Sequence, residues 1–311
     1  TREDNHCTDN NTDELKVKMV SSRINPVDMD LMKGMPFLKY KKPQIGGIDG
    51  AGIVTEVGRN VANFQEGDKV FFYRKFTDIG TWAEEISIKA VDCAKIPESI
   101  ETKDAGAIAL PLLTAYESLQ QLNAKKGEKI LIHGVGGGVG FQALLIAKKM
   151  GLYVVGTASS NDKDFLQKSG LDQFIDYKTQ DFATVLNKGN VNYVFDLLGE
   201  ETLMKSIAIQ PKKIVSVRYV DPNKMEKVGI NMPSILKWVM KLTMKKFDKA
   251  AKNNNNVQLI GQVTGANGKL LQDAIDFIKD DFITRNYPAL TLAEIEQNGL
   301  NEKSIGKIIH F

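Results

Sequence analysis

Apolar runs alternate with amphipathic helical patterns through the middle of the chain. The apolar runs lie at residues 130–133, 153–157, 174–177, 193–196, 214–217 and 257–260. Segments with the 3.6-residue period of a helix fit between them. Such alternation predicts an α/β fold with a doubly wound parallel sheet, whose ligand lies across the carboxyl ends of the strands.

The pattern changes before residue 111. Short β-like runs at residues 15–22, 50–57, 68–72 and 82–88 are separated by glycine-containing turns, which predicts a β-rich, partly open barrel. Helical patterns at 269–279 and 293–298 precede a terminal run at 306–309, which we expect to return to the β-rich domain. The predicted division is a β-rich domain from residues 1–110 with 263–311, and a parallel-sheet domain from 111–262.

A lysine-rich amphipathic pattern covers residues 234–252. Its lysines recur every four residues, at Lys237, Lys241, Lys245 and Lys249. A basic amphipathic helix can rest on an anionic membrane. We instead expect the lysines to face water and the apolar side chains to pack on the protein. These apolar side chains are Leu236, Trp238, Val239 and Leu242.

Composition narrows the expected partners and location. The chain is 42% hydrophobic and carries a net charge of only +3, too little to indicate nucleic-acid binding. No apolar run approaches the roughly 20 residues that span a bilayer, and no signal peptide is visible. Cys7, Cys93 and three scattered histidines give neither a disulfide framework nor metal-ligand spacing. We therefore expect a cytoplasmic protein that binds no metal, nucleic acid or membrane.

The strongest chemical signal is the glycine cluster GVGGGVG at residues 134–140, between a predicted strand and a predicted helix. A pyrophosphate needs bare backbone N–H groups, the positive end of a helix dipole and no Cβ in the way. The cluster departs from the G-x-G-x-x-G pattern of a Rossmann fold at Val135, and a glycine-rich surface turn is the alternative. The predicted dinucleotide contacts are Gly137, Gly138, Val139 and Gly140.

The residues after the second strand bear on the choice of cofactor. An NAD site normally places an acid there, on the ribose 2′-hydroxyl. Ser159, Ser160 and Lys163 stand there instead, and their hydroxyls and cation suit the 2′-phosphate of NADPH. Asp162 is the dissenting residue, although it could simply cap the next helix. Lys163 could equally be a solvated helix lysine.

Several motifs together resemble the medium-chain dehydrogenase/reductase superfamily, and within it the zinc-independent quinone oxidoreductases related to zeta-crystallin. These motifs are NPVD at 25–28, GIDGAGIV at 47–54, GDKV at 67–70, LTAY at 113–116 and the glycine turn. The resemblance implies a GroES-like catalytic domain and a homodimer formed through the last Rossmann strand, near residues 257–262. It also implies that Asn25 and Thr114 lie beside the nicotinamide, and that Lys163 and Tyr177 hold the adenosine 2′-phosphate.

The zinc ligands of the alcohol dehydrogenases in this superfamily have no counterpart here. No cysteine stands near Asn25, and no His-Glu pair stands at residues 48–49. Without a Lewis acid, reduction of an electron-poor substrate is the more plausible chemistry. We therefore expect an NADPH-dependent oxidoreductase that passes hydride to a quinone or a similar conjugated carbonyl compound. An alkenal or enone double-bond reductase, and an NADPH-binding sensor or structural protein without turnover, are the alternatives.

The proton donor and the substrate pocket stay open. Related quinone reductases often carry a tyrosine shortly after the N-x-x-D motif, and Asp30 stands in its place here. Tyr40 and Tyr73 are candidate donors, beside solvent and a cofactor hydroxyl. His133 is expected to be a packed strand residue rather than a catalytic one. An apolar substrate wall, or alternatively part of the barrel core, is predicted at Phe37, Leu38, Phe72, Tyr73 and Trp82.

Overall fold

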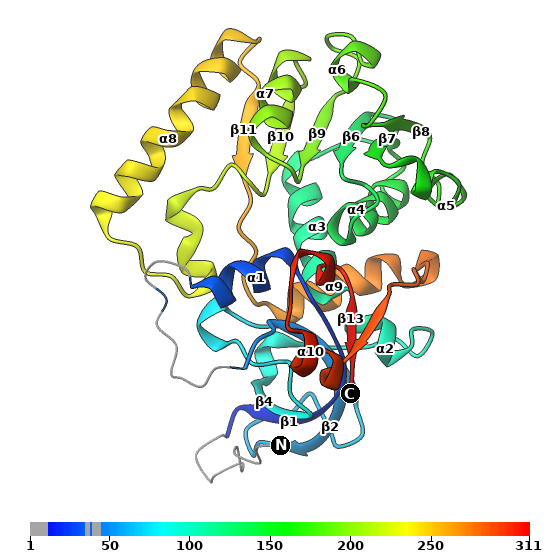
Figure 1. The fold of residues 1–311 in the computed structure, drawn as a ribbon, viewed down its shortest axis with the longest axis vertical. Coiled ribbons are helices and arrows are strands. Elements are labelled where there is room, and N and C mark those ends of the chain that lie inside the picture. Colours follow the sequence, from blue (N-terminus) through cyan, green and yellow to red (C-terminus); the bar gives the residue numbers. More distant parts are fainter. Residues whose placement is uncertain (1–11, 35–37, 39–44) are drawn as a thin grey trace.

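The chain builds two β-sheets with a long buried helix between them (Figure 1). The computed structural model describes residues 12–34, 38 and 45–311. One sheet takes its strands from residues 14–95 and 289–310, and the other takes them from residues 129–261. The helix between the sheets is α3 (Ala109–Leu122). Where one domain ends and the next begins remains a prediction.

The second sheet is parallel throughout, in the order β11-β10-β9-β6-β7-β8. The strand order reverses between β6 and β9, which is the switch point of a Rossmann sheet. The predicted doubly wound sheet is confirmed, and each predicted strand end lies within one residue of the observed end. The strands are β6 (Lys129–His133), β7 (Tyr153–Ala158), β8 (Gln173–Asp176), β9 (Tyr193–Asp196), β10 (Lys213–Ser216) and β11 (Gln258–Gly261).

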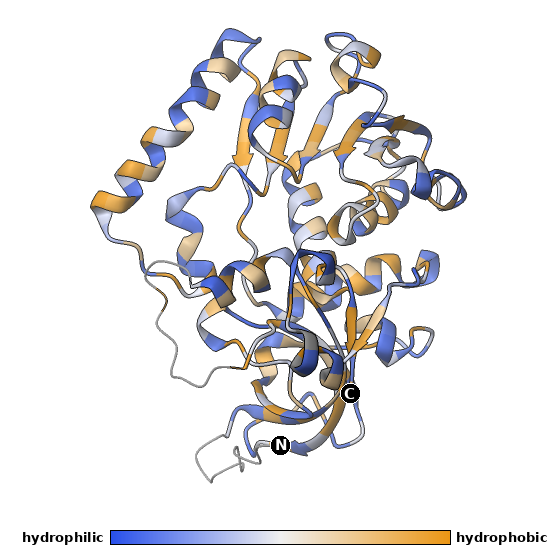
Figure 2. Cartoon of the chain, in the orientation of Figure 1, coloured by the Kyte–Doolittle hydropathy of each residue, from blue (hydrophilic) through white to orange (hydrophobic). Residues whose placement is uncertain are grey.

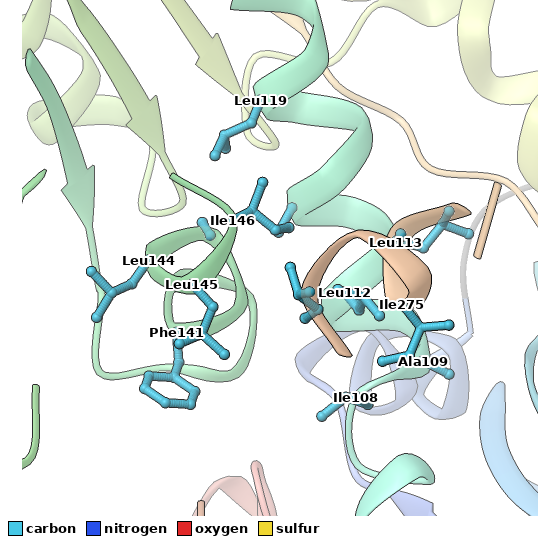
Figure 3. Close-up of a cluster of buried hydrophobic side chains, with 14 of the residues drawn as sticks. Ile108, Ala109, Leu112, Leu113, Leu119, Phe141, Leu144, Leu145, Ile146 and Ile275 are labelled. Atoms are coloured by element: carbon cyan, nitrogen blue, oxygen red, sulfur yellow. The ribbon is translucent and has the colours of Figure 1, made fainter. Parts of the chain in front are cut away.

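Helices cover both faces of this sheet because its strands are apolar on both sides; the strands are orange in Figure 2. Helix α3 packs on α4 and on α9, so one hydrophobic core joins the two sheets (Figure 3). Leu112 and Leu113 of α3, Leu145 and Ile146 of α4 and Ile275 of α9 contribute to it. The other helices of this part are α4 (Gly138–Lys149), α5 (Lys163–Lys168), α6 (Phe182–Val185), α7 (Glu200–Ala208) and α8 (Ser234–Asn253). Helix α9 (Gly268–Ile278) packs between α3 and the first sheet.

The first sheet is mixed, in the order β12-β13-β1-β2-β3-β5, with β4 also paired to β1. Strand β1 serves three partners because register shifts after Lys16 and Met19 bend it. The terminal strand β13 pairs with β1, as predicted, and the sheet does not close into a barrel. The elements are β1 (Glu14–Arg23), α1 (Pro26–Lys33), β2 (Asp49–Val57), β3 (Lys69–Tyr73), β4 (Glu85–Lys89), β5 (Cys93–Lys95), α2 (Thr102–Ala105), β12 (Ala289–Thr291), α10 (Leu292–Asn298) and β13 (Ile308–His310).

Two sequence predictions about local structure are wrong. Strand β4 begins at Glu85 rather than at residue 82, because Trp82 turns inward against Gly46 and Gly47, where a Cβ would lie 2.5 Å from its ring. Helix α8 does not bury the predicted apolar set: Trp238, Val239 and Leu242 are exposed. The stripe that packs instead contains Phe247 and Ala251. None of the helices in the described parts of the chain is long and apolar enough to cross a membrane.

Candidate active site

The glycine turn follows β6 directly and opens α4 at the switch point of the parallel sheet. The Gly137 N–H donates to the Gly134 carbonyl at 2.9 Å, which closes the turn. Gly138, Val139 and Gly140 follow, and their N–H groups have no acceptor among the residues that the structure describes. Free N–H groups at the positive end of a helix dipole form an anion site. The predicted contacts therefore meet at one place.

Close contacts within the chain explain why this turn needs glycine. A Cβ on Gly140 would lie 2.2 Å from the Gly134 carbonyl oxygen, so the helix could not pack so closely on the turn. A Cβ on Gly136 would lie 2.6 Å from Oδ2 of Asp162. At Gly138 it would lie 3.0 Å from the guanidinium carbon of Arg23. The glycine turn is thus lined by the charged side chains of Asp162 and Arg23, in addition to the bare backbone N–H groups predicted from the sequence.

Arg285 joins the turn to the loop after β7. Its guanidinium forms an ion pair with Asp162 at 2.7 Å and also donates to the Gly136 carbonyl. The rings of Phe141 and Phe165 hold it, with its guanidinium carbon 5.8 and 5.3 Å from their centroids. Asp162 stands at the N-cap position of α5 but makes no capping hydrogen bond there. Its negative charge is neutralised by Arg285, which weakens it as an NAD-type ribose ligand.

Arg23, the last residue of β1, brings a second guanidinium to the turn. It is only 5% exposed, lies 4.1 Å above the ring centroid of Tyr287 and donates to the Ala107 carbonyl at 3.3 Å. No carboxylate within the described parts of the chain forms an ion pair with it. The buried Asp49 interacts with the guanidinium electrostatically without forming an ion pair. A buried cation with no directly paired anion is costly, so this arrangement favours an anionic ligand nearby. Neither arginine belongs to a sequence motif, because Arg23 directly follows the predicted strand at residues 15–22 and Arg285 lies between the predicted helices at 269–279 and 293–298.

The residues predicted for the 2′-phosphate meet at the carboxyl ends of β7 and β8. These strands pair in parallel up to Ala158 and Asp176, and the Tyr177 N–H donates to the Ala158 carbonyl at 3.3 Å. Lys163 is exposed, with Nζ 5.9 Å from the ring centroid of Phe174 in β8. The group of Ser159, Ser160, Lys163 and Tyr177 therefore shares one edge of the sheet, and Tyr177 is largely exposed.

Asn25 lies between two buried carboxyl groups. Its Nδ2 donates to Oδ1 of Asp49 at 3.0 Å, and its backbone N–H donates to Oδ2 of Asp28 at 2.7 Å. Burial raises the pKa of Asp49 to about 7. Burial, together with the neighbouring Asp49, also raises the pKa of Asp28 well above its usual range. Asp49 accepts the N–H of Leu110 at 3.3 Å, which ties Asn25 to α3 one turn before the buried Thr114.

The structure does not support Tyr73 as a proton donor. Its side chain is buried, and its hydroxyl donates to the Thr264 carbonyl at 3.0 Å. Burial raises the pKa of Tyr73, so it holds its proton strongly. Phe72 and Trp82 are also buried, as the core alternative for the substrate wall requires. Tyr40 and Phe37 lie outside the described residues.

His133 is a packed strand residue, as predicted. It is buried, with Nε2 2.9 Å from Oγ of Ser206 and its ring 4.5 Å from that of Phe182. Burial lowers the pKa of His133 to about 3. Among the residues with a defined position, no three His, Cys, Asp or Glu side chains gather to hold a metal ion. Independence from zinc remains a prediction from the motifs.

Comparison with known proteins places both halves of the chain. Residues 11–98 match the alcohol dehydrogenase GroES-like domain, and residues 138–213 match the zinc-binding dehydrogenase family. A chloroplastic quinone-oxidoreductase homolog of Spinacia oleracea is 33% identical over 199 residues, which are 61% of this chain and 60% of that relative. The matched part thus spans less than two thirds of the relative's length.

Solved structures share the fold over nearly the whole chain. The quinone oxidoreductase of Coxiella burnetii superposes with a TM-score of 0.78 and 26% identity, over 96% of this chain and 91% of that one. The Escherichia coli quinone oxidoreductase, solved with NADPH, has a TM-score of 0.73 and 22% identity, over 96% and 92% of the two chains. The chain belongs to the medium-chain dehydrogenase/reductase superfamily, and within it is similar to the zeta-crystallin-like quinone oxidoreductases.

Proposed function

We propose that this protein is an NADPH-dependent oxidoreductase that passes hydride to a quinone or a similar conjugated carbonyl compound. The observation that carries the proposal is the convergence of positive groups on the start of α4. Three free N–H groups meet the guanidinium groups of Arg23 and Arg285 there, with Asp162 as the one paired carboxylate. The relatives named as quinone oxidoreductases support the choice of acceptor.

Each side chain then has a defined task. Arg23 and Arg285 add charge to the N–H groups that hold the pyrophosphate, since guanidinium groups match phosphate oxygens well. Lys163 and Tyr177, with the two serines before them, hold the 2′-phosphate. Asn25 and Thr114 position the nicotinamide, and Asp49 fixes the amide of Asn25 by accepting its Nδ2. When bound, NADPH supplies the hydride, while the chain supplies position and a dry cleft.

The test follows the oxidation of NADPH and NADH by the purified protein with quinones, alkenals and simple aldehydes. We expect turnover with quinones and a preference for NADPH. Turnover with alkenals alone would favour the double-bond reductase. Tight binding of NADPH without oxidation by any acceptor would favour a sensor or structural protein.

The cofactor preference is tested separately through Lys163→Ala. This change should weaken NADPH binding much more than NADH binding, because only NADPH carries the 2′-phosphate. Lys168→Ala, an exposed lysine at the end of the same helix, is the matched control. Equal losses for the two cofactors would contradict the assignment of Lys163.

We further propose that two copies pair through β11, which is an edge strand of the parallel sheet. An exposed edge offers unpaired N–H and C=O groups to a second copy. Light scattering after size exclusion should give the mass of a dimer, and the mass of a monomer would count against pairing.

A further inference from the structure

Helix α8 carries two separate apolar stripes, and only one of them packs on the protein. Phe247 and Ala251 are buried, and the C-terminal half is held by an ion pair between Lys246 and Glu200 at 2.9 Å. Asp248 accepts the Tyr219 hydroxyl at 2.6 Å. The stripe of Phe247 and Ala251, together with these polar contacts, therefore accounts for the packing of α8 on its own domain.

The second stripe faces solvent near the Ser234 end of α8, where the ribbon is orange in Figure 2. Its members are Ile235, Trp238, Val239 and Leu242, which are 75%, 60%, 43% and 37% exposed. The spacing i, i+3, i+4, i+7 puts them on one side of the helix. Isolated exposed apolar residues are ordinary, but a contiguous stripe of them marks an interaction surface.

Positive charge surrounds this stripe. Helix α8 contains six lysines and one aspartate. Lys241, Lys245 and Lys249 form no ion pair with any residue that the structure describes. Lys245 and Lys249 continue the line of Trp238 and Leu242 along the helix, since they follow at the same helical spacing. The exposed side of α8 is therefore apolar at its start and basic toward its end.

We propose that α8 docks this protein on an anionic lipid surface. Lysine-rich helices that expose tryptophan and aliphatic side chains bind at the membrane interface through buried apolar area together with attraction to anionic lipids. Tryptophan favours that depth, and each lysine near an anionic surface adds about 1 kcal/mol, or about a fivefold gain in affinity. A second copy docked through α8 would instead bring six more lysines against the first six. Charge complementarity thus selects an anionic surface over self-association.

The experiment uses the full chain and two kinds of vesicle, phosphatidylcholine alone and phosphatidylcholine with about 30 mol% phosphatidylglycerol. We expect flotation only with the anionic vesicles, and at least a tenfold weaker affinity when salt is raised from low to about 0.5 M, because screening removes the lysine contribution. The chain has two tryptophans, and Trp82 is buried. A blue shift of the fluorescence on binding therefore reports Trp238.

Two variants separate the parts of the proposal. Trp238→Ser with Leu242→Ser should lower affinity for the anionic vesicles at least tenfold, whereas Val91→Ser, at an apolar residue elsewhere that is even more exposed, should not. Lys245→Gln with Lys249→Gln should lower it about 25-fold and leave the far-ultraviolet circular dichroism and NADPH affinity unchanged.

Three results would overturn the proposal. The first is no binding to anionic vesicles at low salt, and the second is equal binding to neutral vesicles. The third is that the double change at Trp238 and Leu242 converts a dimer into a monomer in light scattering without altering vesicle binding. That result would assign the stripe to a second copy of the chain.

Discussion

Replacing Arg285 with alanine tests whether the guanidinium groups at the glycine turn hold the cofactor. In the structure, Arg285 pairs with Asp162 and donates to the Gly136 carbonyl. A hydrogen bond to a charged group contributes about 1.5–3 kcal/mol, and 1.4 kcal/mol is tenfold in an equilibrium constant. Arg285→Ala should therefore raise the Kd of NADPH by about 10- to 150-fold.

Asp162→Asn should act in the opposite direction. The substitution keeps the shape of the side chain and removes the negative charge that now neutralises Arg285. A partly exposed charge pair contributes up to about 1 kcal/mol, so NADPH should bind up to about fivefold more tightly. Opposite effects of the two substitutions on NADPH affinity would show that Arg285 acts through its positive charge. If the Arg285–Asp162 ion pair only held the two parts of the chain together, either substitution would weaken binding.

The assay is a titration of NADPH binding by calorimetry at low salt, without any acceptor, so that turnover does not enter. Arg59→Ala, an exposed arginine in another part of the chain, is the control. Thermal unfolding of each variant shows whether the protein remains folded at the titration temperature. Wild-type affinity in Arg285→Ala, or equal weakening by Arg285→Ala and Asp162→Asn, would refute the reasoning.

Three further predictions concern stability. Gly140→Ala should lower the Tm and abolish NADPH binding, because its Cβ would lie 2.2 Å from the Gly134 oxygen, whereas Gly137→Ala, with 3.3 Å to the same oxygen, should be mild. Tyr287→Phe should leave the free energy of unfolding unchanged or raise it by up to about 1 kcal/mol. The buried hydroxyl has no hydrogen-bond partner among the described residues, and the substitution keeps the ring on which Arg23 stacks. A lower free energy of unfolding in urea would show that the hydroxyl is hydrogen-bonded. Because burial lowers the pKa of His133 to about 3, only the unfolded chain takes up this proton between about pH 6.5 and 3, so stability falls as the pH falls through that window. His133→Gln should remove about 2 kcal/mol of the loss between pH 6 and 4.5, measured by urea unfolding across pH, and an unchanged slope would contradict the buried neutral histidine.

The parallel sheet was readable from the sequence because both of its faces are covered. Strands such as β9 are then apolar at nearly every position, so the first and last apolar residues of each run indicate where the strand begins and ends. Helix α8 shows the limit of the same reasoning. Periodicity reveals apolar stripes, but it does not say which stripe meets the protein, since that depends on the orientation of the helix on its sheet. The helix itself was therefore predicted correctly from the sequence, but the prediction that Trp238 and Leu242 pack on the protein was wrong, since both are exposed.

In the candidate site, too, the features formed by neighbouring residues were predicted from the sequence, whereas those formed by residues far apart in the chain were not. The glycine turn is local, because a strand, a turn and a helix that follow each other must place three N–H groups together. The charge that surrounds it is not local: Arg285 lies 149 positions after Gly136, and Arg23 comes from the other sheet. Neither arginine belongs to a motif, yet together they outnumber the one carboxylate at the turn. We propose that this excess of positive charge, which exists only once the two sheets meet, makes the glycine turn a site for an anionic dinucleotide rather than a close-packed loop.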